Sequence, residues 1–304
     1  WTSSLLLARL VNVALAVGCV YVTYRIGTEA HDRTAGRFGA LLLALTLGFV
    51  ASAHEVDEDT AMLFFLLLSV YLALRYVRTG VDRYFLAGSF TGGLTIAFKL
   101  TGGVVVFVLA VAAVLYARRS DEEWPTAFLR PRLYLAGMAI GFAVVYVGMP
   151  NVLFGGPTAI FERAFRGMVG HASPQFVSPP PGYPQLLAVL NGLGLPLFVA
   201  SIAGVLSSVR AVWRRAEDTD LAVLVLTPLV VYLAVFSTWA NVKTHHFLPV
   251  FALLVLLLAR PLAHWYREPG TKRVAVALLV LSTAAYTGVG TLKFASDPRD
   301  GATR

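Results

Sequence analysis

Residues 54–74 read HEVDEDTAMLFFLLLSVYLAL, so an acidic turn leads directly into an apolar segment. Between Thr60 and Leu74 this segment has no charged side chain, and Arg75 follows it. Similar apolar runs recur along the whole chain, which indicates repeated passage through a membrane. The ten candidate runs are 5–24, 38–53, 60–74, 84–98, 102–116, 133–149, 186–209, 221–236, 247–259 and 274–292.

The composition supports the same interpretation. Of the 304 residues, 57% are hydrophobic and 14% charged, and the mean hydropathy of +0.71 exceeds what a soluble domain needs. A span needs ~20 residues to cross ~30 Å of hydrocarbon, so the shorter runs must extend into their flanks. Barrel strands would alternate apolar and polar residues, and these runs are unbroken. The sequence predicts an all-α, polytopic bundle of about ten spans, in which 1–304 form one membrane-embedded domain.

The net charge of +8 could indicate nucleic-acid binding in a soluble protein. In a membrane protein, the basic residues instead indicate which connections face the cytoplasm, so no nucleic-acid partner is expected. If the spans alternate in direction, one set of connections holds seventeen Lys and Arg residues and the other set, with the C-terminal tail, holds six. The basic set lies near 25–37, 75–83, 118–132, 210–215 and 260–273, and it marks the cytoplasmic face. This bias requires the chain to turn back in a hairpin at 99–103.

Three segments lie on the opposite, extracytoplasmic side in this topology. They are the acidic turn at 54–59, a long loop at 150–185 and a short connection at 239–246. Within the long loop, Pro157 suits the first turn of a helix, and the apolar and basic mixture at 160–166 is typical of an amphipathic helix on a membrane surface. The sequence therefore predicts such a surface helix within 150–185.

The acidic turn contains the first candidate catalytic residues, Asp57, Glu58 and Asp59, with Glu55 beside them. Such a density of carboxylates is unfavourable unless they are solvated, bound to a cation or used in catalysis. A hydrated loop is the alternative interpretation, because an acidic turn alone has low specificity. No cofactor is required by the sequence, no metal ligands are assigned, and a divalent metal is the one cofactor to consider.

Basic residues on the same face provide candidate donor-phosphate ligands. Lys99 lies between two apolar residues, where its ammonium must either extend to the interface or meet an anion. Lys243, His245 and His246 precede another span, and Arg9 lies inside the first run, where an unpaired guanidinium is costly. Lysine, histidine and arginine can stabilise a phosphate that accumulates charge as it leaves.

Carboxylates and cations on one face of a helical bundle suit sugar transfer from a polyprenyl phosphate. In such a reaction a base deprotonates an acceptor hydroxyl, which attacks the anomeric carbon while cations stabilise the departing phosphate. A membrane transporter is the alternative interpretation. Transporters, however, place ionisable groups near the membrane midplane, whereas in this chain they are concentrated at one surface. A non-catalytic membrane scaffold is the third interpretation.

Several short motifs resemble the dolichyl-phosphate-mannose protein mannosyltransferase family. They are SAH at 52–54 with DTAMLFF at 59–65, AG at 87–88 with GGLTIAFK at 92–99, NGLGLP at 191–196 and HFLP at 246–249. The family has the GT-C membrane glycosyltransferase fold, shared with the aminoarabinose lipid A transferase. Its outer-facing Asp corresponds to Asp59 and the lysine after its glycine-rich helix to Lys99. Where the family has Arg-Tyr before Leu-Pro, this chain has His246 and Phe247.

The resemblance implies an inverting transferase that moves mannose or a similar hexose from a polyprenyl or dolichyl phosphate to a protein, lipid or glycan acceptor. It implies a multi-pass protein of the cell membrane with its active face outside the cytoplasm. Family members also have an earlier span and a first outer loop with an acidic catalytic base. The resemblance therefore implies that this base lies upstream of Trp1, and that the fragment by itself is inactive.

Overall fold

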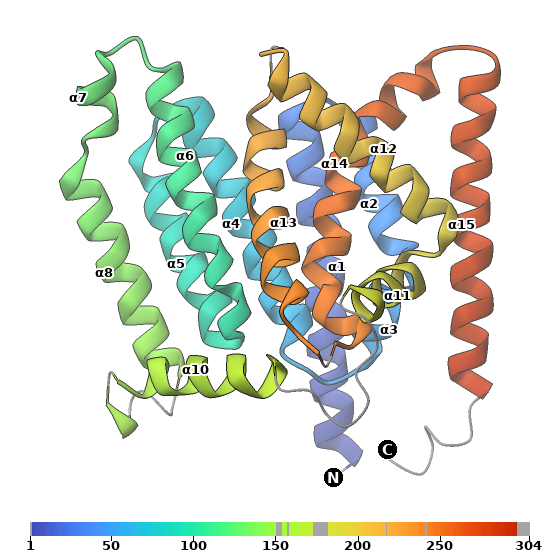
Figure 1. Ribbon diagram of the computed structural model, residues 1–304, viewed down its shortest axis with the longest axis horizontal. Helices are drawn as coiled ribbons and strands as arrows, with labels where there is room; N and C mark the ends of the chain where they lie inside the picture. Colours follow the sequence, from blue (N-terminus) through green and yellow to red (C-terminus); the bar gives the residue numbers. More distant parts are fainter. Residues whose placement is uncertain are drawn as a thin grey trace.

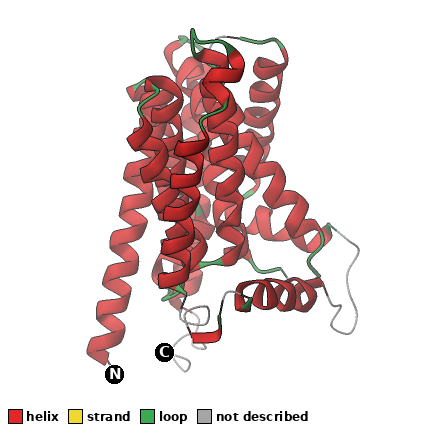
Figure 2. Ribbon diagram, turned by 90° about the vertical axis from the view of Figure 1, so that its left-hand side faces the viewer, coloured by secondary structure: helices red, strands yellow, loops and turns green. Residues whose placement is uncertain are grey.

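The computed structural model describes residues 2–149, 154–156, 158–172, 182–216, 218–240 and 242–296, and every regular element in these ranges is helical (Figure 1, Figure 2). The first half contains α1 (Thr2–Ala30), α2 (Arg33–Ala44), α3 (Leu47–His54), α4 (Asp59–Thr79), α5 (Asp82–Phe98), the 3-10 helix η1 (Leu100–Val104), α6 (Val105–Arg119), α7 (Trp124–Phe128) and α8 (Pro131–Gly148). The second half contains α10 (Ala159–Ala172), α11 (Tyr183–Leu193), α12 (Leu195–Trp213), α13 (Asp220–Ser237), the 3-10 helix η2 (Thr244–Phe247), α14 (Leu248–Arg267) and α15 (Thr271–Ser296).

All ten predicted apolar runs fall on helices, which confirms a multi-pass helical membrane protein. Eight helices in the described ranges are long and apolar enough to cross a membrane, and the pair α2 and α3 qualifies as a ninth span if it is counted as one. The predicted run at 84–98 lies in α5, which has only 17 residues. At ~1.5 Å per residue, α5 extends ~26 Å, slightly less than a ~30 Å hydrocarbon core.

Two predicted runs were wrong as continuous helices. The run at 38–53 is bent by 61° between α2 and α3. The run at 186–209 is interrupted at Gly194, whose φ of +75° and ψ of 154° are incompatible with an α-helix. Pro196 follows in the first turn of α12, where its missing amide hydrogen costs no helical hydrogen bond. Local backbone chemistry thus divides segments that hydropathy alone joins.

The helices separate their connections into two ends of the bundle (Figure 1). The basic end holds the connections 31–32, 80–81, 120–130, 214–219 and 268–270, together with α7. The opposite end, called the site end below, holds the start of α1, the end of α15, the turn between α3 and α4, the turn between α5 and α6, and η2. The predicted hairpin at 99–103 is confirmed, because α5 ends at Phe98 and α6 begins at Val105.

Burial separates central helices from peripheral ones. Of the most apolar 18-residue stretch in each span, 78% is buried in the span of α14 and 67% in that of α4. The corresponding share is 17% in the spans of α8, α12 and α15. A helix that is apolar on all sides belongs inside a bundle, which describes α14. The exposed apolar side chains of α8, α12 and α15 suit contact with lipid chains.

Small residues allow α5 and α8 to approach closely. A Cβ atom at Gly93 would lie 2.8 Å from the Gly141 carbonyl oxygen and 2.8 Å from the Val144 Cβ. Any side chain at position 93 would therefore force the two helices apart. Van der Waals contact between close backbones is a main source of helix association in membranes.

The predicted loop at 150–185 contains α10, which lies across the site end at a large angle to the spans (Figure 1). Its Phe165 and Val169 side chains are exposed and are four residues apart, so they share one face of the helix. Residues 150–153, 157 and 173–181 lie outside the described ranges, including the predicted helix-starting Pro157.

Candidate active site

The acidic turn connects α3 to α4 and organises the start of α4. Asp59 is the first residue of α4, and its backbone amide donates a hydrogen bond of 3.1 Å to Asp57 Oδ1. Carboxylates at this position stabilise the exposed amides and the positive end of the helix dipole. Burial, and secondly the nearby Asp59 carboxylate, raise the pKa of Asp57 to about 6. Asp57 is therefore a carboxyl group that titrates close to neutral pH.

Lys99 connects the start of α4 to the end of α5. It lies between α5 and η1 in an extended conformation (φ −151°, ψ 129°), which directs the chain from one helix to the next. Its Nζ lies 2.6 Å from Asp59 Oδ1, 2.7 Å from Asp59 Oδ2 and 3.7 Å from Glu58 Oε1. The side chain of Asp59 is 3% exposed and that of Lys99 18%. The two residues form a largely buried ion pair whose geometry is close to ideal.

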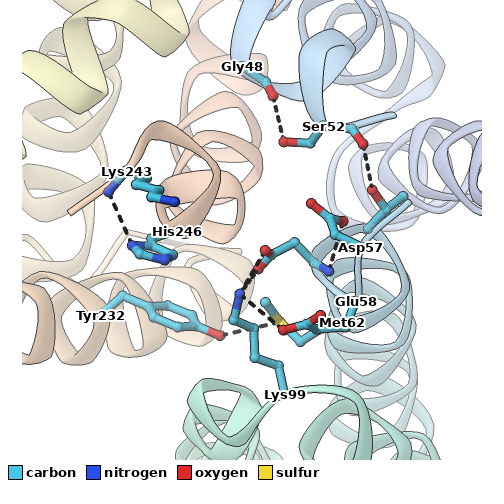
Figure 3. A network of polar contacts seen from close by, with 11 residues as sticks. Gly48, Ser52, Asp57, Glu58, Met62, Lys99, Tyr232, Lys243 and His246 are labelled. Atoms are coloured by element: carbon cyan, nitrogen blue, oxygen red, sulfur yellow. Dashed lines mark hydrogen bonds and ion pairs between the residues drawn. The ribbon is translucent and has the colours of Figure 1, made fainter. Parts of the chain in front are cut away.

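The 3-10 helix η2 places two imidazole rings at the same end. His245 and His246 have ring centroids 4.6 Å apart, and the Lys243 backbone amide donates a 3.2 Å hydrogen bond to His246 Nδ1. His245 lies close enough to Asp59 to interact with it electrostatically. In Figure 3, Lys243 and His246 lie across from Lys99 and the acidic turn. Cationic and potentially cationic groups therefore approach Asp59 from two sides.

Asn12 supports the acidic turn, although the sequence analysis did not identify it. Its buried side-chain amide donates hydrogen bonds to the carbonyl oxygens of Ser52 (3.1 Å), Ala53 (3.3 Å) and Glu55 (2.5 Å). The last carbonyls of a helix have no partner within the helix, so Asn12 satisfies the end of α3. An amide inside an apolar span was the available signal, because such a group requires a partner.

Tyr232 of α13 is a second residue that the sequence analysis missed. It is fully buried, and its hydroxyl lies 3.9 Å from Met62 Sδ, one turn into α4 (Figure 3). On the other side of α4, Thr60 Oγ1 donates to the Ser52 carbonyl oxygen at 3.5 Å, and Ser52 Oγ donates to the Gly48 carbonyl oxygen at 3.0 Å. A tyrosine in an apolar run was the signal, since a buried hydroxyl needs a polar neighbour.

A cavity of about 600 Å³ lies between α3, α11, η2 and α15. Its polar lining includes Ser52, Glu55, His245, Tyr286 and Lys293. This volume is in the range of small-molecule sites. Glu55 of the acidic turn and His245 of η2 line the cavity, whereas Asp59 and Lys99 do not.

The structure thus brings together most of the predicted site residues. Asp57, Glu58, Asp59 and Lys99 form one contact group, and His245 is near it. Arg9 is separate: it forms no hydrogen bond or ion pair with a described residue, and its Nε is buried without a partner. Among the described residues there is no group of three or more His, Cys, Asp or Glu side chains placed to hold a metal ion.

Comparison with known proteins identifies the fold and relates the first half of the chain to glycosyltransferases. Residues 2–150 match the family model described as dolichyl-phosphate-mannose-protein mannosyltransferase. The chain is also 30% identical over 146 residues to an STT3B subunit of the dolichyl-diphosphooligosaccharide–protein glycosyltransferase of Oryza sativa subsp. japonica. That alignment covers 46% of this chain and 20% of the rice protein, so the chain spans about a fifth of that relative.

Two solved structures share the arrangement of helices. ArnT from Cupriavidus metallidurans, bound to undecaprenyl phosphate, matches with a TM-score of 0.59 and 19% identity over 84% of this chain and 46% of its own. The Archaeoglobus fulgidus oligosaccharyltransferase matches with a TM-score of 0.59 and 15% identity over 93% of this chain and 44% of its own. The match over residues 2–150 relates the first half of the chain to this family, and the arrangement of helices that the chain shares with these two enzymes is the GT-C fold.

Proposed function

We propose that this chain contributes the active site of a glycosyltransferase that takes its sugar from a lipid-linked donor. The donor is a polyprenyl or dolichyl phosphate carrying mannose or a similar hexose, and the acceptor is a protein, lipid or glycan. The main support is the buried pair of Asp59 and Lys99 at one end of a membrane bundle. The two imidazoles of η2 and a cavity lined by Glu55 and His245 lie at the same end.

Lipid phosphate as the donor group has two further supports. The similar ArnT structure is bound to undecaprenyl phosphate, and the archaeal oligosaccharyltransferase has been solved with a dolichol-phosphate. In this chain, Lys99 Nζ has three N–H groups, of which two are directed to the Asp59 oxygens. The third can donate to a phosphate oxygen while Asp59 fixes the position of the ammonium.

The proposed reaction is a single displacement with inversion at the anomeric carbon. The acceptor oxygen forms a bond to that carbon and transfers its proton to a carboxylate, while the bond from the carbon to the phosphate oxygen breaks. The electron pair of that bond stays with the lipid phosphate, which leaves with one additional negative charge. Lys99, with His245, His246 and Lys243 as further candidate donors, stabilises this charge more in the transition state than in the bound donor.

Asp57 and Asp59 have different proposed roles in this scheme. Asp59 is held by Lys99 and acts as a positioning group for donor or acceptor, with Glu58 completing the charge around the ammonium. Asp57 has a pKa of about 6, and a carboxylate with a pKa near the working pH is suited to proton transfer.

We propose that the site end faces the extracytoplasmic side of the cell membrane. The support is the concentration of arginine and lysine in connections at the basic end, which is typical of cytoplasmic loops. In this orientation, the bundle is one membrane-embedded domain, and α10 lies on the outer membrane surface with Phe165 and Val169 in the interface.

Substitution of Asp59 by Asn tests the proposed function. The full natural protein is reconstituted in vesicles with a polyprenyl-phosphate hexose, and transfer to an acceptor is measured. We expect the variant to lose at least about 100-fold in kcat, because removal of a positioned charged group typically costs this much. Asp121→Asn is the matched control, since this exposed aspartate lies at the basic end.

Elution volume and thermal unfolding in detergent show whether the Asp59→Asn variant still folds. Transfer activity equal to that of the Asp121→Asn control, in a folded Asp59→Asn protein, would refute the proposed role of Asp59. Uptake of a solute by vesicles that show no transferase activity would contradict the enzymatic proposal as a whole.

A further inference from the structure

A second cavity, of about 540 Å³, lies at the basic end, opposite the candidate active site. It is lined by the connection between α1 and α2, the last turns of α12, the start of α13 and the last three turns of α14, which meet at the same end of the bundle in Figure 1. Ser207 and Ser208 form a polar wall, and Leu256 and Leu257 form an apolar floor. The proposed sugar transfer does not use this cavity.

Most charged groups around the cavity already have partners of opposite charge. Asp32 Oδ2 lies 2.7 Å from Arg267, while its Oδ1 accepts hydrogen bonds from two amides at the start of α2. Asp218 lies 3.7 Å from Arg78 and 3.5 Å from Arg119. Each lining carboxylate is therefore neutralised, and these pairs leave little net field of their own.

Arg260 is the exception among the described residues. It lies on α14, lines the cavity, is solvent-exposed and forms no ion pair or hydrogen bond with any described residue. Its near neighbour His31 is partly buried, and burial followed by the charges of Arg260 and Arg78 lowers the pKa of His31 to about 4. His31 is then an uncharged hydrogen-bond donor at neutral pH. His264, also in the lining, is engaged by Glu268 at 2.8 Å.

The cavity has the shape and polarity of a site for an amphiphile. Leu256 and Arg267 are eleven residues apart on α14, which corresponds to ~16 Å along a helix axis. The charged rim therefore lies at the level of the α14 terminus, while the floor reaches into the apolar part of the bundle. α12, which supplies the serines, is a peripheral span with exposed apolar side chains. A lipid packed against α12 would therefore lie beside the helix that supplies the serines.

We propose that this cavity binds a phosphate-bearing anion through Arg260, and that the anion is the headgroup of an anionic membrane phospholipid. The Arg260 guanidinium, which has no partner among the described residues, matches the single charge of a phosphate diester. The hydroxyl of Ser208 can donate to a further phosphate oxygen, whereas that of Ser207 donates to the Gly204 carbonyl oxygen. The apolar floor then receives the upper part of an acyl chain.

The test compares the full chain with its Arg260→Gln and Arg37→Gln variants. Arg37 is exposed on α2 near the same end and has no ion pair with a described residue, so it controls for the loss of one positive charge. Each protein is delipidated in detergent, titrated with phosphatidylglycerol or phosphatidylcholine, and examined by native mass spectrometry for retained lipid. Inorganic phosphate is added as a competitor in a parallel series.

We expect the unsubstituted chain and Arg37→Gln to retain phosphatidylglycerol in preference to phosphatidylcholine. Arg260→Gln should weaken phosphatidylglycerol retention at least about tenfold, the size expected for one charge-assisted contact. Millimolar inorganic phosphate could instead displace phosphatidylglycerol from the unsubstituted chain, while Arg260→Gln responds to neither phosphate nor phosphatidylglycerol. This result would support the anion site, with free phosphate as its ligand. Equal phosphatidylglycerol retention by folded Arg260→Gln and Arg37→Gln overturns the proposal.

Discussion

The ammonium of Lys99 contacts both carboxylate oxygens of Asp59, at 2.6 and 2.7 Å, although the two residues are 40 positions apart. Asp59 begins one membrane helix and Lys99 follows the end of the next, so the pair fixes two helix termini against each other. Neither charge has enough contact with water to be stable alone. The contact therefore has a structural and a chemical consequence, and both can be measured.

Replacing Lys99 by Met should affect stability and transfer together. Loss of one partner leaves the Asp59 carboxylate buried and uncompensated, which in buried pairs costs about 3–5 kcal/mol. Because Lys99 is partly exposed, we expect about 2–3 kcal/mol in unfolding experiments in detergent micelles. Transfer should fall at least about 100-fold, because the leaving phosphate loses its principal cation.

The double variant Asp59→Asn with Lys99→Met separates the two effects. Without either charge, the bundle should regain at least about half of the lost stability, while transfer stays absent. Lys99→Arg keeps the charge and serves as the conservative control. Additive destabilisation in the double variant would show that the pair is not energetically coupled.

Asp57 should make the protein less stable as the pH rises through about 6. Its pKa is raised from 3.8 to about 6 in the folded chain, so the folded state binds this proton more tightly than the unfolded state does. The resulting stabilisation is full below pH 3.8 and is lost as the pH rises through 6. After allowance for partial solvent contact, the expected change is about 1–2 kcal/mol.

Thermal unfolding at pH 4.5 and pH 7.5 measures this effect. Asp57→Asn, which stays neutral and can still accept the Asp59 amide hydrogen bond, should not show the decrease at higher pH. The exposed Asp121→Asn variant should follow the unsubstituted protein. If the melting temperatures of the Asp57→Asn variant and the unsubstituted chain changed equally with pH, a raised pKa of Asp57 would be ruled out.

Asn12→Leu should loosen the acidic turn without touching a charged residue. The substitution leaves three carbonyl groups at the end of α3 without their donor, at a cost of about 1–3 kcal/mol. Because the turn positions Asp57 and Asp59, kcat should also fall by about tenfold. Ser4→Ala on the exposed side of the same helix is the control, with no expected change. Unchanged melting and transfer would show that Asn12 does not support the turn.

Gly194→Ala should destabilise the junction between α11 and α12. Gly194 has a positive φ, and an added Cβ would lie 2.6 Å from Tyr286 Cδ1 on α15. Strain and overlap together should cost about 2–4 kcal/mol and lower the melting temperature. Gly170→Ala in α10 is the control. An added Cβ there has no neighbour within 4 Å, and alanine favours a helix more than glycine does, so its effect should be neutral or slightly stabilising. Equal melting of both variants would contradict this assignment.

Much of the architecture was predictable because membrane insertion is governed by local hydropathy. Each apolar run became helical, and the hairpin after Lys99 followed from the distribution of arginines and lysines. The interruptions at Leu45 and Gly194 were not predicted, since hydropathy does not report backbone conformation. The sequence predicted only that Asp59 and Lys99 lie on the same side of the membrane. Their direct contact could not be predicted, because the pattern of apolar residues does not determine which helix ends meet.

The sequence by itself determined that the chain crosses a membrane as helices and that carboxylates and cations gather on one side, since burial of apolar residues and placement of charges depend on composition along the chain. Tertiary structure alone decided that Asn12 supports the acidic turn, that Tyr232 packs beside α4, that Arg9 remains apart, and that Arg260 lacks a partner among the described residues. These facts depend on distances between helices, and such distances arise only when the whole bundle packs.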